Sequence, residues 1–109
     1  MTIEQLAEKV LRKLGRFDGA TDPEDLQNVT DAYTGVWYTL NDDGLVTWTV
    51  TEDIPDRFQL SVVSLVAAEL APTYGQQEVD PRLKQTYTNA LRRQLASGQP
   101  TDVVTAEYY

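Results

Sequence analysis

The feature that most constrains this sequence is an apolar segment in its middle, residues 53–75, which reads DIPDRFQLSVVSLVAAELAPTYG. Strands rarely exceed about 10 residues, and a membrane-spanning helix needs about 20 predominantly apolar ones, whereas this segment begins beside Arg57 and is interrupted by Glu69. Its few polar residues do not share one face at helical spacing, and a helix that is apolar nearly all round belongs in the centre of a bundle. We therefore predict a buried core helix, with Phe58, Val62, Leu65, Val66 and Leu70 as its core residues.

Helix-start patterns lie on both sides of this segment. Thr2 and Gln5 have the spacing of a capping box. Asp22 and Asp80 each precede a proline, which is the order expected of an N-cap and the first helical residue. Apolar residues then recur at helical spacing. These patterns predict helices over residues 3–14, 23–40 and 81–97, packed around the core helix in a mainly α, four-helix bundle.

Two segments lack a helical period. Residues 41–54 contain the turn NDDG followed by alternating apolar and polar side chains, which predicts a short strand, β-hairpin or extended loop inserted into a domain spanning residues 1–98. Residues 99–109 (QPTDVVTAEYY) favour extended backbone, so we predict a C-terminal arm that binds a neighbouring chain. The alternative is an arm that folds back onto its own bundle. The candidate binding residues of the arm are Val103, Val104, Tyr108 and Tyr109.

The residue types present exclude several kinds of chemistry. The chain has no cysteine and no histidine, which removes disulfides, thiolate metal sites and a Ser-His-Asp triad. The turn NDDG does not fit a calcium loop, because placing Gly44 sixth puts Thr39 first and Val50 last. Carboxylates near residue 53 could bind Mg²⁺ or act as acid and base, but we favour solvated side chains, with Asp53 or Asp56 capping the core helix. We expect no enzyme activity, no metal and no cofactor.

Negative charge is concentrated in one part of the chain. The formal net charge is -8, and residues 17–56 contain ten acids and no base. Such asymmetry describes the electrostatic field of the protein rather than its fold. The acids expected at the inserted loop are Asp42, Asp43, Glu52 and Asp53.

Four sequence stretches together resemble the head-to-tail adaptor proteins of tailed double-stranded-DNA bacteriophages, also called head-completion, tail accessory or packaged-DNA stabilisation proteins. The likeness covers residues 6–96, and the stretches are VLRKLG, DPEDLQ, DGL and the core segment DIPDRFQLSVVSLVAAELAPTYG. The resemblance implies a ring, generally of twelve subunits, that binds beneath the portal protein. Such a ring extends the DNA channel and provides the platform on which the tail or its nozzle protein assembles.

The resemblance also implies roles for the segments described above. Residues 41–54 become a projecting loop or hairpin, and the arm binds the portal or a neighbouring subunit. Acids that face the channel let packaged DNA pass without tight binding, because like charges repel. The implied location is the head–tail junction of the virion, after synthesis in the host cytoplasm and without a membrane. Two alternatives remain open: a small acidic regulator that mimics DNA, and a carboxylate-based metal-dependent hydrolase.

Overall fold

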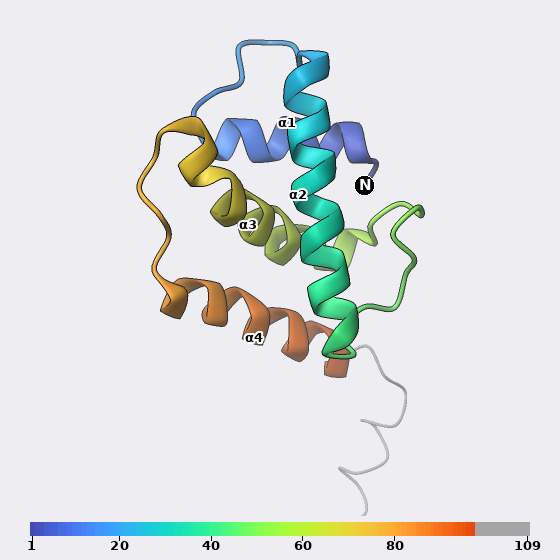
Figure 1. The fold of residues 1–109 in the computed structure, drawn as a ribbon. Helices are drawn as coiled ribbons and strands as arrows, with labels where there is room; N and C mark the ends of the chain where they lie inside the picture. Colours follow the sequence, from blue (N-terminus) through green and yellow to red (C-terminus); the bar gives the residue numbers. More distant parts are fainter. Residues whose placement is uncertain (98–109) are drawn as a thin grey trace, which may run out of the picture.

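The computed structural model describes residues 1–97, which form four α-helices and contain no strand (Figure 1). The predicted mainly α fold with four helices is confirmed. Two 3₁₀ turns, Asp56–Phe58 and Ala71–Tyr74, flank the third helix. The helices are α1 (Ile3–Lys13), α2 (Pro23–Asp42), α3 (Gln59–Leu70) and α4 (Pro81–Ser97).

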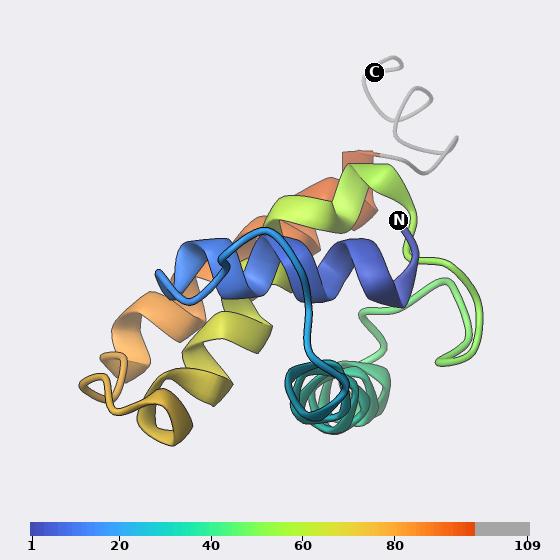
Figure 2. The same cartoon turned by 90° about the horizontal axis from the view of Figure 1, so that it is seen from above.

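Helix α3 is the centre of the bundle and contacts each of the other three helices. In Figure 1 it lies between α1 and α4, while α2 runs across it. Figure 2 views α2 along its axis and places it to one side of the other helices. Nine of the twelve residues of α3 are buried, and the exceptions are Gln59, Leu60 and Glu69. The burial of α3 among three other helices accounts for the long apolar segment, residues 53–75, in an otherwise acidic chain.

All five residues expected in the core lie in the hydrophobic core of the structure. Val62 and Val66 have no exposed surface, and Phe58 and Leu70 are almost as deeply buried. Leu65 keeps 9% of its surface exposed because it lines a groove between α2 and α4. The core helix is shorter than its apolar segment, since the chain tightens into 3₁₀ turns at both ends.

The starts of α1, α2 and α4 follow local sequence signals, although the Asp22 side chain at the start of α2 forms no capping hydrogen bond. Both hydrogen bonds of the Thr2–Gln5 capping box are present, and the Asp80 carboxylate accepts a hydrogen bond from the Arg82 amide at 2.9 Å. The prediction that Asp53 or Asp56 caps the core helix is wrong, because no side chain caps either α3 or the 3₁₀ turn before it. Asp56 instead contacts the amino group of Met1.

Of the short strand, β-hairpin or loop expected in residues 41–54, the structure contains a loop, so the strand and the hairpin are wrong. Helix α2 continues to Asp42, and an irregular loop then leads to the 3₁₀ turn at Asp56. Leu45, Trp48 and Ile54 of this loop are each at most 6% exposed. These side chains anchor the loop to the core through packing. Residues 1–97 contain no strand with which the loop backbone could pair. The predicted arm, residues 99–109, lies outside the described residues.

Candidate functional site

The candidate site is the acidic end of the bundle, which we define as residues 42–56: the last residue of α2, the α2–α3 loop and the first residue of the following 3₁₀ turn. It contains five carboxylates and no base. Asp42 and Asp43 end α2, whereas Glu52 and Asp53 lie at the far side of the loop, and all four are exposed. The structure therefore places the four predicted acids in two separate pairs, Asp42 and Asp43 at the end of α2 and Glu52 and Asp53 late in the loop.

Trp48 fixes the middle of this loop to the bundle. Its indole Nε1 donates a buried hydrogen bond of 2.8 Å to the Tyr33 hydroxyl on α2. Its ring stacks on Phe58 with 5.2 Å between ring centres, and its backbone carbonyl accepts a 3.1 Å hydrogen bond from the Trp37 indole. The loop is thus attached both to α2 and to the 3₁₀ turn that leads into α3.

Burial at this contact extends the pH range over which Tyr33 is neutral. Desolvation raises the pKa of Tyr33 above its usual value, and the hydrogen bond from Trp48 opposes that rise. The neutral hydroxyl can accept the indole hydrogen while its ring stays in the core, which is the usual arrangement for a buried tyrosine. The contact therefore stabilises the loop throughout the neutral pH range.

Glu52 holds a tight turn within the loop. Its carboxylate accepts a hydrogen bond of 2.8 Å from the Thr49 amide, and the Glu52 amide donates back to the Thr49 carbonyl at 3.1 Å. The backbone hydrogen bond from Thr49 lowers the pKa of Glu52, because it favours the charged carboxylate. Glu52 is consequently a structural acid of the loop as well as an exposed charge.

Acidification is expected to release this turn. A carboxylate whose pKa is lower in the folded state stabilises that state above its unfolded pKa, and the stabilisation disappears as pH falls through the folded value. We expect the Thr49 amide resonance in an NMR titration to follow Glu52 with a midpoint below the usual pKa of an exposed glutamate. Glu52→Gln should remove that transition from the Thr49 amide. A midpoint at or above the usual glutamate pKa would contradict the assigned hydrogen bond.

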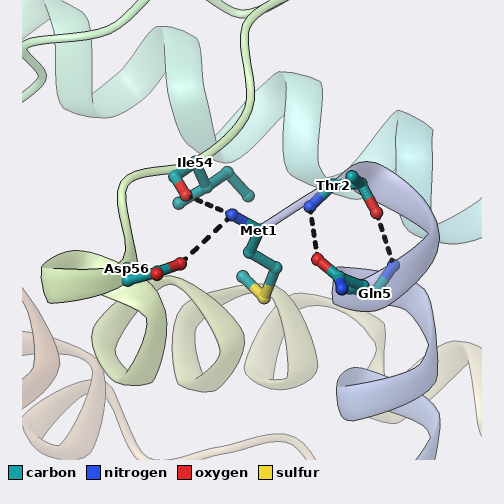
Figure 3. Close-up of polar contacts among 5 residues, drawn as sticks. All are labelled: Met1, Thr2, Gln5, Ile54 and Asp56. Carbon is teal, nitrogen blue, oxygen red and sulfur yellow. Dashed lines mark hydrogen bonds and ion pairs between the residues drawn. The ribbon is translucent and has the colours of Figure 1, made fainter.

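The end of the loop is joined to the start of α1 (Figure 3). The Met1 amino group donates to the Ile54 carbonyl at 2.7 Å and lies 3.3 Å from a carboxylate oxygen of Asp56. The Ile54 amide donates to the Met1 carbonyl at 2.8 Å. The same view contains the capping box of Thr2 and Gln5. The acidic end is therefore fixed at its middle by Trp48 and at its end by Met1.

A cavity of about 330 Å³ opens beside these contacts, between the start of α1, the middle of α2 and the loop. The polar side chains in its lining are carboxylates and hydroxyls, a composition suited to hydrogen-bond donors and cations. No group of three or more acids within residues 1–97 is arranged to hold a metal ion. The polar residues that line the cavity are Thr2, Glu4, Thr30, Tyr33, Thr34, Thr51, Glu52 and Asp53.

Comparison with models of protein families, with curated proteins and with solved structures found no match for this chain. None of the helices in residues 1–97 has the combination of length and apolar character that crossing a bilayer requires. Functional inference therefore depends on the residues and their geometry.

Sequence reasoning located the acids of the site but missed the contacts that fix them. One contact is the hydrogen bond from Trp48 to Tyr33, and another joins Met1 to Asp56. Each joins two segments that are separated in the sequence. One signal was available: Tyr33 and Trp37 are one helical turn apart, so both can face the same segment. The arm residues, by contrast, have no structural description. They are Val103, Val104, Tyr108 and Tyr109.

Proposed function

We propose that this chain is a structural virion protein, a head-to-tail adaptor that forms a ring on the portal of a tailed bacteriophage, extends its DNA channel and carries the tail. The observation that carries the proposal is the fixed acidic end. Five carboxylates and no base lie on residues 42–56, and this loop is held by Trp48, Glu52 and Met1. Repeated around a ring, such a loop produces a collar of negative charge at a constant position.

A fixed negative collar suits a channel through which DNA moves. Phosphates bind to lysine and arginine with a strength that grows with each contact, and such binding would retard a passing duplex. Carboxylates repel phosphates, so the duplex stays centred and mobile. Because the loop is packed on the core, its backbone holds Asp43, Glu52 and Asp53 at a constant position in the subunit, while Asp56 is paired with the Met1 amino group.

The sequence resemblance supports the same role. It extends over residues 6–96, which include all of α2, α3 and the intervening loop. In the proposed ring, the buried α3 supplies the rigidity of each subunit, and the loop acids Asp43, Glu52 and Asp53 face the channel. The arm, residues 99–109, is assigned to the portal or to a neighbouring subunit.

Electron microscopy of this protein mixed with the portal protein encoded in the same genome tests the proposal. We expect a ring on one end of the portal, absent when either protein is imaged alone. Portal particles without added density would contradict the adaptor role. A stable dimer of this chain alone, measured by light scattering, together with bare portals would favour an acidic regulator.

Charge removal tests the role of the acidic end in that ring. Asp43→Asn with Asp53→Asn leaves the Glu52 turn intact, so the ring should still dock. We expect the docked ring to bind short duplex DNA more tightly than wild type in fluorescence anisotropy at low salt, since repulsion is reduced. The control is Asp18→Asn with Glu78→Gln, which removes two exposed charges elsewhere. Equal DNA binding by the two variants would refute the channel-facing assignment.

A further inference from the structure

We propose that adjacent subunits contact each other through α2 of one copy and α4 of the next. The inference depends on the proposed ring for its biological use, but the contact itself is a property of this chain. Its basis is a pair of complementary helix faces, one acidic and one basic, that point away from the core of the same subunit.

The two helices carry opposite charge without exception. Helix α2 has four acids and no base, whereas α4 has four bases and no acid. None of these side chains forms an ion pair within residues 1–97, where the ion pairs involve Met1 with Asp56 and Glu8 with Arg12. The acids of α2 are Glu24, Asp25, Asp31 and Asp42, and the bases of α4 are Arg82, Lys84, Arg92 and Arg93.

The charged rows lie opposite the buried faces of both helices. Helix α2 packs on α3 and buries Val29, Tyr33 and Leu40, while α4 packs on α3 and buries Leu91. At helical spacing, the opposite side of each helix presents one row of exposed residues. The α2 row is Asp31, Gly35, Tyr38 and Asp42, and the α4 row is Arg82, Thr86, Asn89 and Arg93.

The two rows have the same spacing. Eleven residues separate the two acids of the α2 row, and eleven separate the two bases of the α4 row. At a rise of about 1.5 Å per residue, each separation is about 17 Å. Two such helices lying side by side can therefore pair both acids with both bases at once. An antiparallel pair joins Asp31 to Arg93, and a parallel pair joins Asp31 to Arg82.

The residues between the charges suit a close helix contact. Gly35 has no side chain, and a Cβ built at its position meets nothing within 4 Å, so this part of the face is open. Tyr38 is 53% exposed, although its ring already contacts the edge of Trp37. In either direction of the partner helix, Thr86 and Asn89 lie opposite Gly35 and Tyr38. An exposed tyrosine beside a flat glycine is a favourable anchor for an interface.

Contact between two different faces has consequences for assembly. The outer faces of α2 and α4 in one subunit point away from their shared neighbour α3, so they cannot pair with each other. A head-to-tail contact between unlike faces generates a ring when its rotation closes. One helix pair held largely by exposed charges gives a weak contact, so we expect a monomer at low concentration and assembly when the portal binds several copies together.

Cysteine cross-linking tests the contact without the portal, because the natural chain has no cysteine. Gly35→Cys is mixed with Asn89→Cys or with Thr86→Cys at low salt and treated with a short bis-maleimide. Asn89 lies opposite Gly35 in the antiparallel register, and Thr86 does so in the parallel register. We expect one of these mixtures to yield at least ~10-fold more cross-linked dimer than any variant alone, since unlike faces attract and like faces repel. Equal yields, or cross-links mainly between like variants, would overturn the proposal.

Charge reversal supplies the matched control. Asp31→Arg in the Gly35→Cys chain should abolish the cross-link, and the reverse change in the partner chain, Arg93→Asp or Arg82→Asp according to register, should restore it. Asp18→Arg, which makes the same change outside the face, should leave the yield unaltered. Failure of both partner changes to restore cross-linking would refute the pairing. Rings on the portal without this cross-link would refute the α2–α4 contact alone, whereas the cross-link without portal binding would refute only the adaptor function.

Discussion

Replacement of Val66 with aspartate is expected to abolish cooperative folding. Val66 lies in the middle of α3 and has no exposed surface. A carboxylate there would be buried in the hydrophobic core, on the helix that contacts the other three. Burial of such a group costs several kcal/mol even after its pKa shifts, and a small domain has only about 5–15 kcal/mol of total stability. Circular dichroism should record no sigmoidal thermal transition.

The matched control lies on the same helix. Leu60 is 74% exposed, so Leu60→Asp makes a similar chemical change at a site already in contact with solvent. Surface substitutions of this kind usually change stability by less than about 0.5 kcal/mol, and we expect the melting temperature to stay within about 4 °C of wild type. If the two variants melted alike, α3 would not be the buried centre of the bundle.

The core helix could be predicted from sequence because its signal is local. A long apolar segment with no polar face can only be buried at the centre of a small domain, and α3 buries nine of its twelve residues. The capping box at Thr2 and the Asp80-Pro81 start also depend on residues within one turn of each other. Local signals of this kind do not change when the rest of the chain is rearranged.

The loop could not be predicted because its conformation depends on distant partners. Alternating apolar and polar residues suit a strand, yet a strand needs a second strand to satisfy its backbone, and residues 1–97 provide none. Trp48 finds its partners Tyr33 and Phe58 on either side of the loop. Asp56 is predicted as a helix cap for the same reason, because its actual partner, the amino group of Met1, is distant in the sequence.

Part of the candidate site could be predicted from the sequence, and part could not. Composition alone identifies residues 17–56 as uniformly acidic. It does not reveal that Glu52 is engaged with the Thr49 backbone while Asp53 carries only exposed charge. The complementary rows on α2 and α4 follow from sequence once the helix bounds are known. Their relevance to assembly appears only when α3 is seen to occupy the inner face of both helices.

Trp48→Ala is expected to destabilise the domain by about 3–5 kcal/mol, the range for removal of a buried aromatic side chain. The side chain is 6% exposed, stacks on Phe58 and donates to the Tyr33 hydroxyl. Urea unfolding monitored by circular dichroism measures the loss. Trp37→Phe is the control, because it removes the hydrogen bond to the Trp48 carbonyl while keeping an aromatic ring in a half-buried position. A single hydrogen bond contributes about 0.5–1.5 kcal/mol.

The position of the acidic end depends on the same tryptophan. In Trp48→Ala, the loop keeps its attachment at Met1, the internal Glu52 turn and the bond from the Trp37 indole to the backbone carbonyl of residue 48. It loses the indole hydrogen bond to Tyr33 and the stacking on Phe58. Hydrogen exchange at the amides of residues 45–50 should accelerate in Trp48→Ala under conditions where α3 remains protected, since local opening needs less free energy than global unfolding. Equal destabilisation by Trp48→Ala and Trp37→Phe, with unchanged exchange in the loop, would contradict the anchoring role. Faster exchange confined to the loop would show that Trp48 fixes the acidic end without being needed for the packing of the bundle. The contacts of α3 with α1 and α4 do not depend on Trp48.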